Sequence, residues 1–72
     1  MSSLENKIKA VMSVGVINTE DNIRRCSRKY NLSKKWLRRR GERMAEIYKF
    51  NRELTEQQAR VLARDIIQSK NN

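Results

Sequence analysis

The sequence predicts an all-α protein folded as a small bundle of four helices. The chain has 72 residues, no proline and two glycines. Its apolar residues recur with the spacing of buried helix faces, a pattern that a disordered, solvated tail has no reason to show. A chain of this length buries only about 60% of the surface that its unfolded form exposes, so its core must be compact and local. We therefore expect residues 1–72 to form a single helical domain.

The first helix is predicted over residues 3–13. Ser2 followed by Glu5 has the spacing of a capping box, which satisfies free amides at a helix start. The apolar residues at i, i+4, i+7 and i+8 are Leu4, Ile8, Val11 and Met12. Gly15 is expected to end the helix. The apolar residues around it are then expected to form a connection that folds back onto the core: Val14, Val16 and Ile17.

The second helix is predicted over residues 20–30. Asn18 and Thr19 offer side-chain oxygens that cap a helix start, and Glu20 and Asp21 place negative charge where the helix dipole favours it. Its predicted inward face is narrow and contains small residues: Ile23, Cys26, Ser27 and Tyr30.

The third helix is predicted over residues 33–51. Asn31 is among the few non-glycine residues that tolerate a left-handed conformation at a helix end, and Ser33 can cap the next helix. The apolar stripe of this helix is Trp36, Leu37, Met44, Ile47 and Tyr48. Arg40 and Gly41 interrupt it. The helix either bends near residue 41 or runs through, and we expect it to run through.

The last helix is predicted over residues 55–69. Thr55 and Gln58 have the spacing of a second capping box. One face is apolar, with Ala59, Leu62, Ala63, Ile66 and Ile67, and the other is polar, with Arg60, Arg64 and Gln68. This helix is expected to serve either as a fourth core element or as a dimerisation surface.

The basic excess of the chain is confined to residues 24–43. This window holds ten basic residues and one acid, Glu42, whereas the other 52 residues hold seven of each, so the window carries the whole net charge of +9. A solvated helix face usually mixes charges of both signs. A localised excess therefore indicates a polyanionic partner. The ten basic residues are Arg24, Arg25, Arg28, Lys29, Lys34, Lys35, Arg38, Arg39, Arg40 and Arg43.

Composition argues against several other classes. No apolar run approaches the ~20 residues of a membrane span, and the first residues lack the features of a signal peptide. We expect a cytoplasmic protein, associated with the nucleoid when bound to DNA. With no histidine and a single cysteine, Cys26, the sequence offers no zinc site and no cysteine–histidine catalytic pair. We expect neither enzymatic activity nor a cofactor or metal.

The segment from Cys26 to Arg40 has a defined pattern of side chains. Ser27 is small, Tyr30 closes a helix, Asn31 suits a left-handed turn, and three further residues follow in order as corner plug, N-cap and inward aliphatic: Leu32, Ser33 and Leu37. The pattern resembles the helix-turn-helix DNA-binding motif of small tri-helical, transposase-like and repressor-like proteins, over roughly residues 20–48.

Two positions depart from this family's pattern. Arg40 stands where the family usually has an apolar residue or tryptophan, and Trp36 stands where a small residue is more common. Either the helix is rotated so that Trp36 enters the core and Met44 closes its end, or Trp36 lies at the edge of the core.

The resemblance implies a small DNA-binding transcriptional regulator, of phage, plasmid or bacterial type, whose second motif helix lies in the major groove of double-stranded DNA. It implies base contacts from Lys34, Lys35, Arg38 and Arg39. It implies phosphate contacts from Arg24, Arg25, Arg28, Lys29, Ser33 and Arg43. A homodimer through the C-terminal helix would present two such motifs.

Two other functions remain open. The same basic residues would suit an RNA-binding or ribosome-associated protein, although RNA recognition usually uses exposed aromatic side chains, of which this chain has few. They would also suit an adaptor that docks on an acidic protein of the transcription machinery. Trp36, Tyr30 and Tyr48 are expected in or beside the core, and Cys26 is expected to be a small buried hydrophobe.

Overall fold

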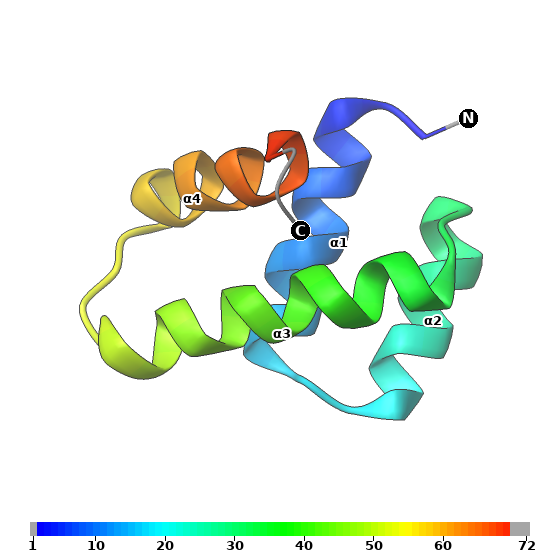
Figure 1. Ribbon diagram of the computed structural model, residues 1–72, viewed down its shortest axis with the longest axis horizontal. Coiled ribbons are helices and arrows are strands. Elements are labelled where there is room, and N and C mark those ends of the chain that lie inside the picture. Colours follow the sequence, from blue (N-terminus) through cyan, green and yellow to red (C-terminus); the bar gives the residue numbers. More distant parts are fainter. Residues whose placement is uncertain (1, 70–72) are drawn as a thin grey trace.

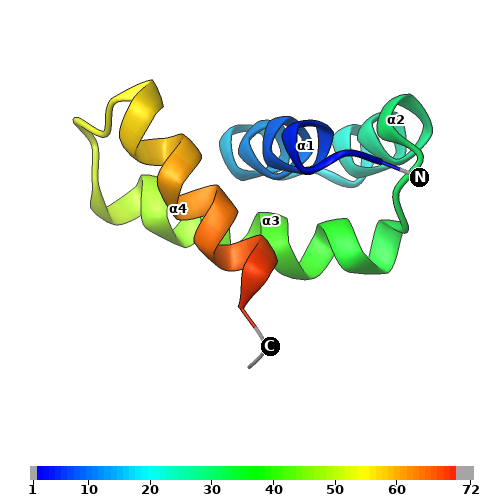
Figure 2. The same ribbon diagram turned by 90° about the horizontal axis from the view of Figure 1, so that it is seen from above.

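The computed structural model describes residues 2–69, and these form four α-helices without any strand. The helices are α1 (Leu4–Val16), α2 (Glu20–Tyr30), α3 (Lys34–Phe50) and α4 (Glu56–Gln68). The predicted all-α class and the four-helix arrangement are therefore confirmed. Figure 1 shows α3 running across the molecule, with α2 beside its N-terminal half and α4 beside its C-terminal half. α1 crosses α3 and makes its most extensive helix–helix contact there, and Figure 2 shows α1 and α2 on the same side of α3.

The N-terminus of α1 differs from the prediction. Ser3, not Ser2, caps the helix, and its Oγ accepts a hydrogen bond of 3.1 Å from the backbone amide of Asn6. Ser2 instead donates its hydroxyl to the carbonyl of Tyr30 at the end of α2. The predicted Ser2–Glu5 capping box is therefore wrong, because Ser2 is used in a contact with a residue distant in the sequence.

The C-terminus of α1 also lies later than predicted, at Val16 instead of about residue 13. Gly15 is buried inside the helix, where a Cβ would lie only 2.6 Å from Cγ of Met44 on α3. The glycine is needed for a close approach between helices, so the prediction that it ends the helix was wrong.

The apolar residues at the end of α1 divide between core and surface. Val14 is fully buried, whereas Val16 and Ile17 are 65% and 56% exposed. The prediction that all three fold back onto the core is correct for Val14 and wrong for the other two, which lie at the end of α1 and in the short link to α2.

The starts of the other three helices are capped as predicted. Thr19 accepts from the backbone amide of Asn22, and Ser33 accepts from that of Trp36. Thr55 and Gln58 form the reciprocal capping box. Asn18 does not cap α2, because its amide donates back to the carbonyl of Val14 (3.1 Å).

The core consists of two clusters on either side of the α1–α3 crossing. The first, between α1, α3 and α4, comprises Ile8, Val11, Met44, Ala59, Ala63 and Ile66. The second, between α1, α2 and α3, comprises Ala10, Val14, Ile23, Cys26 and Leu37. Trp36 packs against both clusters. The predicted apolar face of α4 thus contributes to the core, and Arg60, predicted on its polar face, forms an ion pair with Glu5 of α1.

Two glycines make the α1–α3 crossing possible. A Cβ at Gly41 of α3 would lie 2.1 Å from Cγ1 of Val14, just as one at Gly15 of α1 would meet Met44. Each helix therefore contributes one glycine against a large side chain of the other. α3 runs without a break through Gly41, as predicted. Among residues 2–69, no helix is both long and apolar enough to cross a membrane.

Candidate nucleic-acid interface

The turn between α2 and α3 is fixed by hydrogen bonds at Ser27 and Leu32. Asn31 is left-handed, with φ 55°, as its position in the sequence predicts. The backbone amide of Leu32 donates to the carbonyl of Ser27 (3.0 Å), and the hydroxyl of Ser27 donates to the carbonyl of Leu32 (2.6 Å). Ser27 therefore holds both polar backbone groups of Leu32. The sequence predicts only that Ser27 is small, whereas its hydroxyl fixes the direction in which α3 leaves α2.

Asn22 joins the start of α2 to the end of α1. Its side chain is buried, and its amide nitrogen lies within 3.0–3.2 Å of the carbonyl of Ser13, the hydroxyl of Ser13 and the carbonyl of Ile17. The carbonyl of Ser13 also accepts from the backbone amide of Ile17, and the carbonyl of Ile17 accepts from that of Thr19. Asn22 therefore gives each of these carbonyls at the end of α1 a second donor. The sequence analysis missed Asn22, because no local pattern distinguishes it from a surface residue.

The basic residues of α2 and of the N-terminal half of α3 lie at the same end of the molecule, to the right in Figure 1. We call this the basic end. Eight of its ten basic side chains are exposed: Arg24, Arg25, Arg28, Lys29, Lys34, Lys35, Arg39 and Arg43. The other two, Arg38 and Arg40, are half-buried. Ser33, predicted to contact phosphate, is also exposed there.

The basic residues of α2 surround a shallow hollow with Asp21. Arg24, Arg25, Arg28 and Lys29 line it, and Arg24 forms an ion pair with Asp21 one turn earlier. The ammonium group of Lys29 lies 5.4 Å from the centre of the Tyr30 ring. A hollow bordered by four cations and one carboxylate offers an anion such as phosphate several donors at once.

Arg38 is held by a carboxylate from the other helix. Its Nε and Nη2 each donate to one oxygen of Glu20, both at 2.9 Å. The hydrogen bond to Arg38 lowers the pKa of the Glu20 carboxyl and raises that of the guanidinium. Because the pair is solvent-exposed, it contributes little to stability. Its effect is to orient Arg38, and the remaining N–H groups of the guanidinium stay available.

Arg40, one of the two positions that depart from the helix-turn-helix pattern, lies against the other, Trp36. Its guanidinium carbon lies 4.5 Å from the centre of the Trp36 ring, and Nη1 donates to the Trp36 carbonyl at 3.4 Å. Its Nε is buried and finds no hydrogen-bond partner among the described residues. Desolvation, followed by repulsion from Arg39 and Arg43, lowers the pKa of Arg40. Trp36 lies at the edge of the core, as one of the two predicted arrangements requires.

No group of three or more histidine, cysteine, aspartate or glutamate side chains within residues 2–69 is arranged to hold a metal ion. Cys26 is buried and unbridged, and its Sγ lies 3.6 Å from the hydroxyl of Ser13.

Comparison with protein-family models, with curated proteins and with solved structures finds no significant match to this chain.

Proposed function

We propose that the chain binds double-stranded DNA through the basic end and acts as a small transcriptional regulator. The observation that carries this proposal is the placement of ten basic residues, from a window of net charge +9, on α2 and α3 at one end of the molecule. The angle between these helices is fixed by Ser27 and Leu32, so the charges form a pattern of defined shape. A rigid array of cations suits the regular spacing of phosphates in a duplex.

In this proposal the N-terminal half of α3 enters the major groove, which is wide enough to admit one helix. Lys34, Lys35 and Arg39 are exposed on its first turns and would approach base edges. The cations of α2 would contact the phosphate backbone on one side of the groove, and Arg43 would contact it further along α3. Ser33 Oγ already accepts from Trp36, and its own hydrogen is left to donate to a phosphate oxygen.

Arg38 is suited to base recognition because Glu20 orients it. A guanidinium has five N–H donors, and Glu20 occupies Nε and one hydrogen of Nη2. The edge formed by Nη1 and the second hydrogen of Nη2 remains. Two parallel donors of this kind match the O6 and N7 acceptors of guanine. A guanidinium already held in place loses less conformational entropy when it binds.

The test is fluorescence anisotropy with a labelled random-sequence duplex at 50 and 200 mM salt. The five exposed cations assigned to phosphates predict an affinity loss on the order of 10³-fold between these conditions. Absence of binding at 50 mM would overturn the proposal in favour of an acidic protein partner. If structured RNA displaces the duplex at equal concentration, the chain is an RNA-binding protein.

A matched pair of variants locates the interface. Arg39→Ala, in the N-terminal half of α3, and Arg52→Ala, in the loop after α3, remove the same charge from exposed positions far apart along the chain. Only Arg39→Ala is expected to weaken binding, by roughly tenfold at 100 mM salt. Equal effects of the two variants would mean that net charge alone, and not the basic end, determines binding. Selection of bound sequences from a random duplex pool then shows whether bases are recognised.

A further inference from the structure

The end of the molecule opposite the basic end exposes apolar side chains. Phe50, the last residue of α3, is 75% exposed, and Val61 on α4 is 55% exposed. Leu54, in the loop between the helices, and Leu62 are half-buried beside them. We call these four residues the apolar end.

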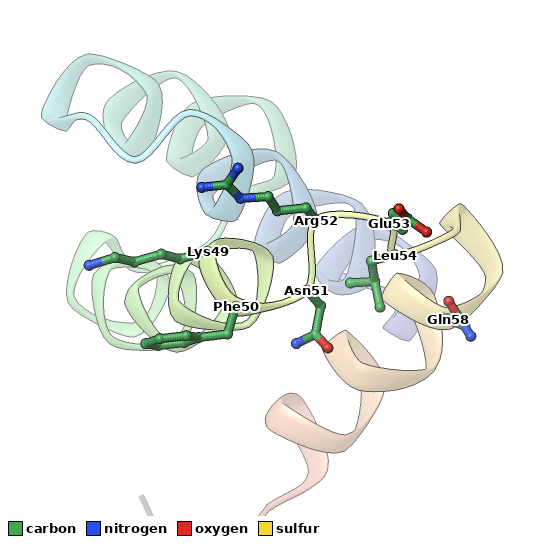
Figure 3. Close-up of a pocket in the computed structure, with 7 residues that line it drawn as sticks. All are labelled: Lys49, Phe50, Asn51, Arg52, Glu53, Leu54 and Gln58. Carbon is green, nitrogen blue, oxygen red and sulfur yellow. The ribbon is translucent and has the colours of Figure 1, made fainter.

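The residues of the apolar end line two adjoining hollows. Leu54, Val61 and Leu62 line a shallow groove with the amides of Gln57 and Gln58. Leu54 and Gln58 also border the adjoining hollow of the α3–α4 loop, which contains Phe50 (Figure 3). In Figure 3, Phe50 and Leu54 lie on either side of Asn51. The hollow with Phe50 is also lined by Lys49, Arg52 and Glu53, and the Lys49 ammonium lies 5.9 Å from the centre of the Phe50 ring. The most apolar part of the surface is therefore the groove of Leu54, Val61 and Leu62.

The charges of residues 44–69, the part of the chain that contains the apolar end, cancel. Residues 44–69 contain four basic and four acidic side chains, in contrast to the net +9 of residues 24–43. The eight are Glu46, Lys49, Arg52, Glu53, Glu56, Arg60, Arg64 and Asp65. A strongly acidic or strongly basic partner finds no net attraction here. A surface with equal numbers of both signs can face its own copy without net repulsion, and each sign can meet the other across a two-fold axis.

We propose that the apolar end binds a second copy of this chain, with Phe50, Leu54, Val61 and Leu62 of each copy forming the centre of a two-fold interface. Two chains of charge +9 repel each other strongly if their basic ends approach. Contact through the apolar end places the basic ends on the far sides of the dimer. The interface also buries the large apolar side chains that this small domain leaves exposed after folding.

A weak but specific dimer requires only a small part of the surface of the chain. An interface at the lower limit of stable size buries about 600 Å² on each partner. That is roughly a ninth of the 5208 Å² that the chain exposes. The face formed by α4, which is about 20 Å long, and the last turn of α3 would have to supply this area. We expect a dissociation constant on the order of 10 µM.

Formation of the dimer does not depend on DNA binding, but its effect on the DNA sequences that are bound rests on the proposed function. If the proposed function holds, a two-fold dimer presents two basic ends to two half-sites, and the selected DNA sequences should be palindromic. If the chain binds another partner, the dimer still forms.

The experiment is sedimentation equilibrium of the full chain, treated with nuclease and kept in 1 M NaCl so that nucleic acid cannot link molecules. Between about 1 and 500 µM the average mass should rise from 8.6 kDa toward twice that value. Val61→Asp should remain monomeric over the whole range, since it places a charge at the centre of the interface on both copies. Val16, at the end of α1, is a similarly exposed valine, and Val16→Asp should dimerise as the unmodified chain does.

A mass of 8.6 kDa for the unmodified chain at all concentrations would overturn the dimer, as would an unchanged dimer of Val61→Asp or equal loss in both valine variants. Circular dichroism checks that each variant is folded. If Val61→Asp unfolds, Phe50→Ser replaces it, because Phe50 is three-quarters exposed and lies outside the core. This variant should raise the dissociation constant at least tenfold. A monomer that still binds duplex DNA rejects the dimer alone, and a dimer that binds none rejects the DNA function alone.

Discussion

The two ends of α3 are held in place by different kinds of contact. At the basic end a tight turn, fixed by the hydroxyl of Ser27, joins α3 to α2, and Glu20 spans the two helices to hold Arg38. At the apolar end the five-residue connection 51–55 joins α3 to α4 and leaves Phe50 largely exposed. At the basic end these polar groups are therefore held by hydrogen bonds within the chain. The apolar end still has surface to bury, which is typical of a contact between molecules.

The two ends are connected through the α1–α3 crossing. Gly15 and Gly41 allow the helices to approach, and Val14 and Met44 fill the space on either side. Leu37 extends this packing toward α2 and the basic end. A change at the crossing should therefore affect the whole domain, whereas a change at either end should affect that end first.

The largest effect is expected from Leu37→Ala. Leu37 is fully buried between α1, α2 and α3, and its loss should lower the free energy of unfolding by about 3 kcal/mol. Leu54→Ala is the control at the apolar end, where the leucine is only half-buried and about 1 kcal/mol should be lost. Urea unfolding followed by circular dichroism measures both. Equal losses would mean that the two ends depend equally on apolar packing.

A smaller loss is expected from Gly41→Ala. The added methyl would lie 2.1 Å from Cγ1 of Val14, a fully buried side chain of fixed rotamer, so the helices must move apart. We expect a loss of about 2 kcal/mol in spite of the better helix propensity of alanine. Glu42→Ala, one residue further along and exposed, should change stability by less than about 0.5 kcal/mol. Unchanged stability of Gly41→Ala would contradict the close crossing.

The sequence predicts the local features of this fold well. The caps of α2, α3 and α4 depend on residues three positions apart, and the left-handed turn depends on Asn31 itself. Their determinants are close in the sequence, so a pattern is sufficient to find them. The same approach failed at Gly15. Glycine is typical of helix ends, but here it is required because α3 approaches closely at Met44, 29 residues further along the chain.

The candidate site is predictable in its charge but not in its arrangement. The positions of the basic residues on α2 and α3 follow from helical periodicity. The pairing of Arg38 with Glu20 joins residues 18 apart, and the hydrogen bonds of Asn22 join two helices. Such contacts depend on how the helices pack. The stacking of Arg40 on Trp36 is an intermediate case, because the two residues are one helical turn apart but an apolar residue is expected at position 40.

Arg40→Met tests whether the half-buried charge of Arg40 lowers the stability of the protein. Arg40 has a buried Nε without a partner and lies near Arg39 and Arg43, which together with desolvation lower its pKa. Methionine keeps the length and the apolar contact with Trp36, so the free energy of unfolding at low salt should rise by about 0.5–1 kcal/mol. Arg39→Met, at an exposed position, should leave it nearly unchanged. A loss of stability in Arg40→Met would show that stacking on Trp36 outweighs the cost of burial.

The smallest effect on folding, and the most specific effect on recognition, is expected from Glu20→Gln. The glutamine removes the charge that holds Arg38 but leaves the helix start intact. On the proposed function, the ratio of affinities for the selected sequence and for random duplex should fall roughly fivefold. Lowering the pH should act in the same direction. Because the pKa of Glu20 is lowered, its pairing with Arg38 is complete above the ordinary glutamate pKa and is lost as the pH falls through the lowered value.

Asp21→Asn is the matched control for this effect. It removes the neighbouring carboxylate, which pairs with Arg24 among the cations assigned to phosphates. Its loss should raise the affinity for every duplex and leave the ratio unchanged, because phosphate contacts carry no sequence information. If Glu20→Gln also raises all affinities equally, Glu20 acts only as a negative charge near the DNA. Arg38 would then belong with the phosphate contacts of the basic end and not with its base contacts.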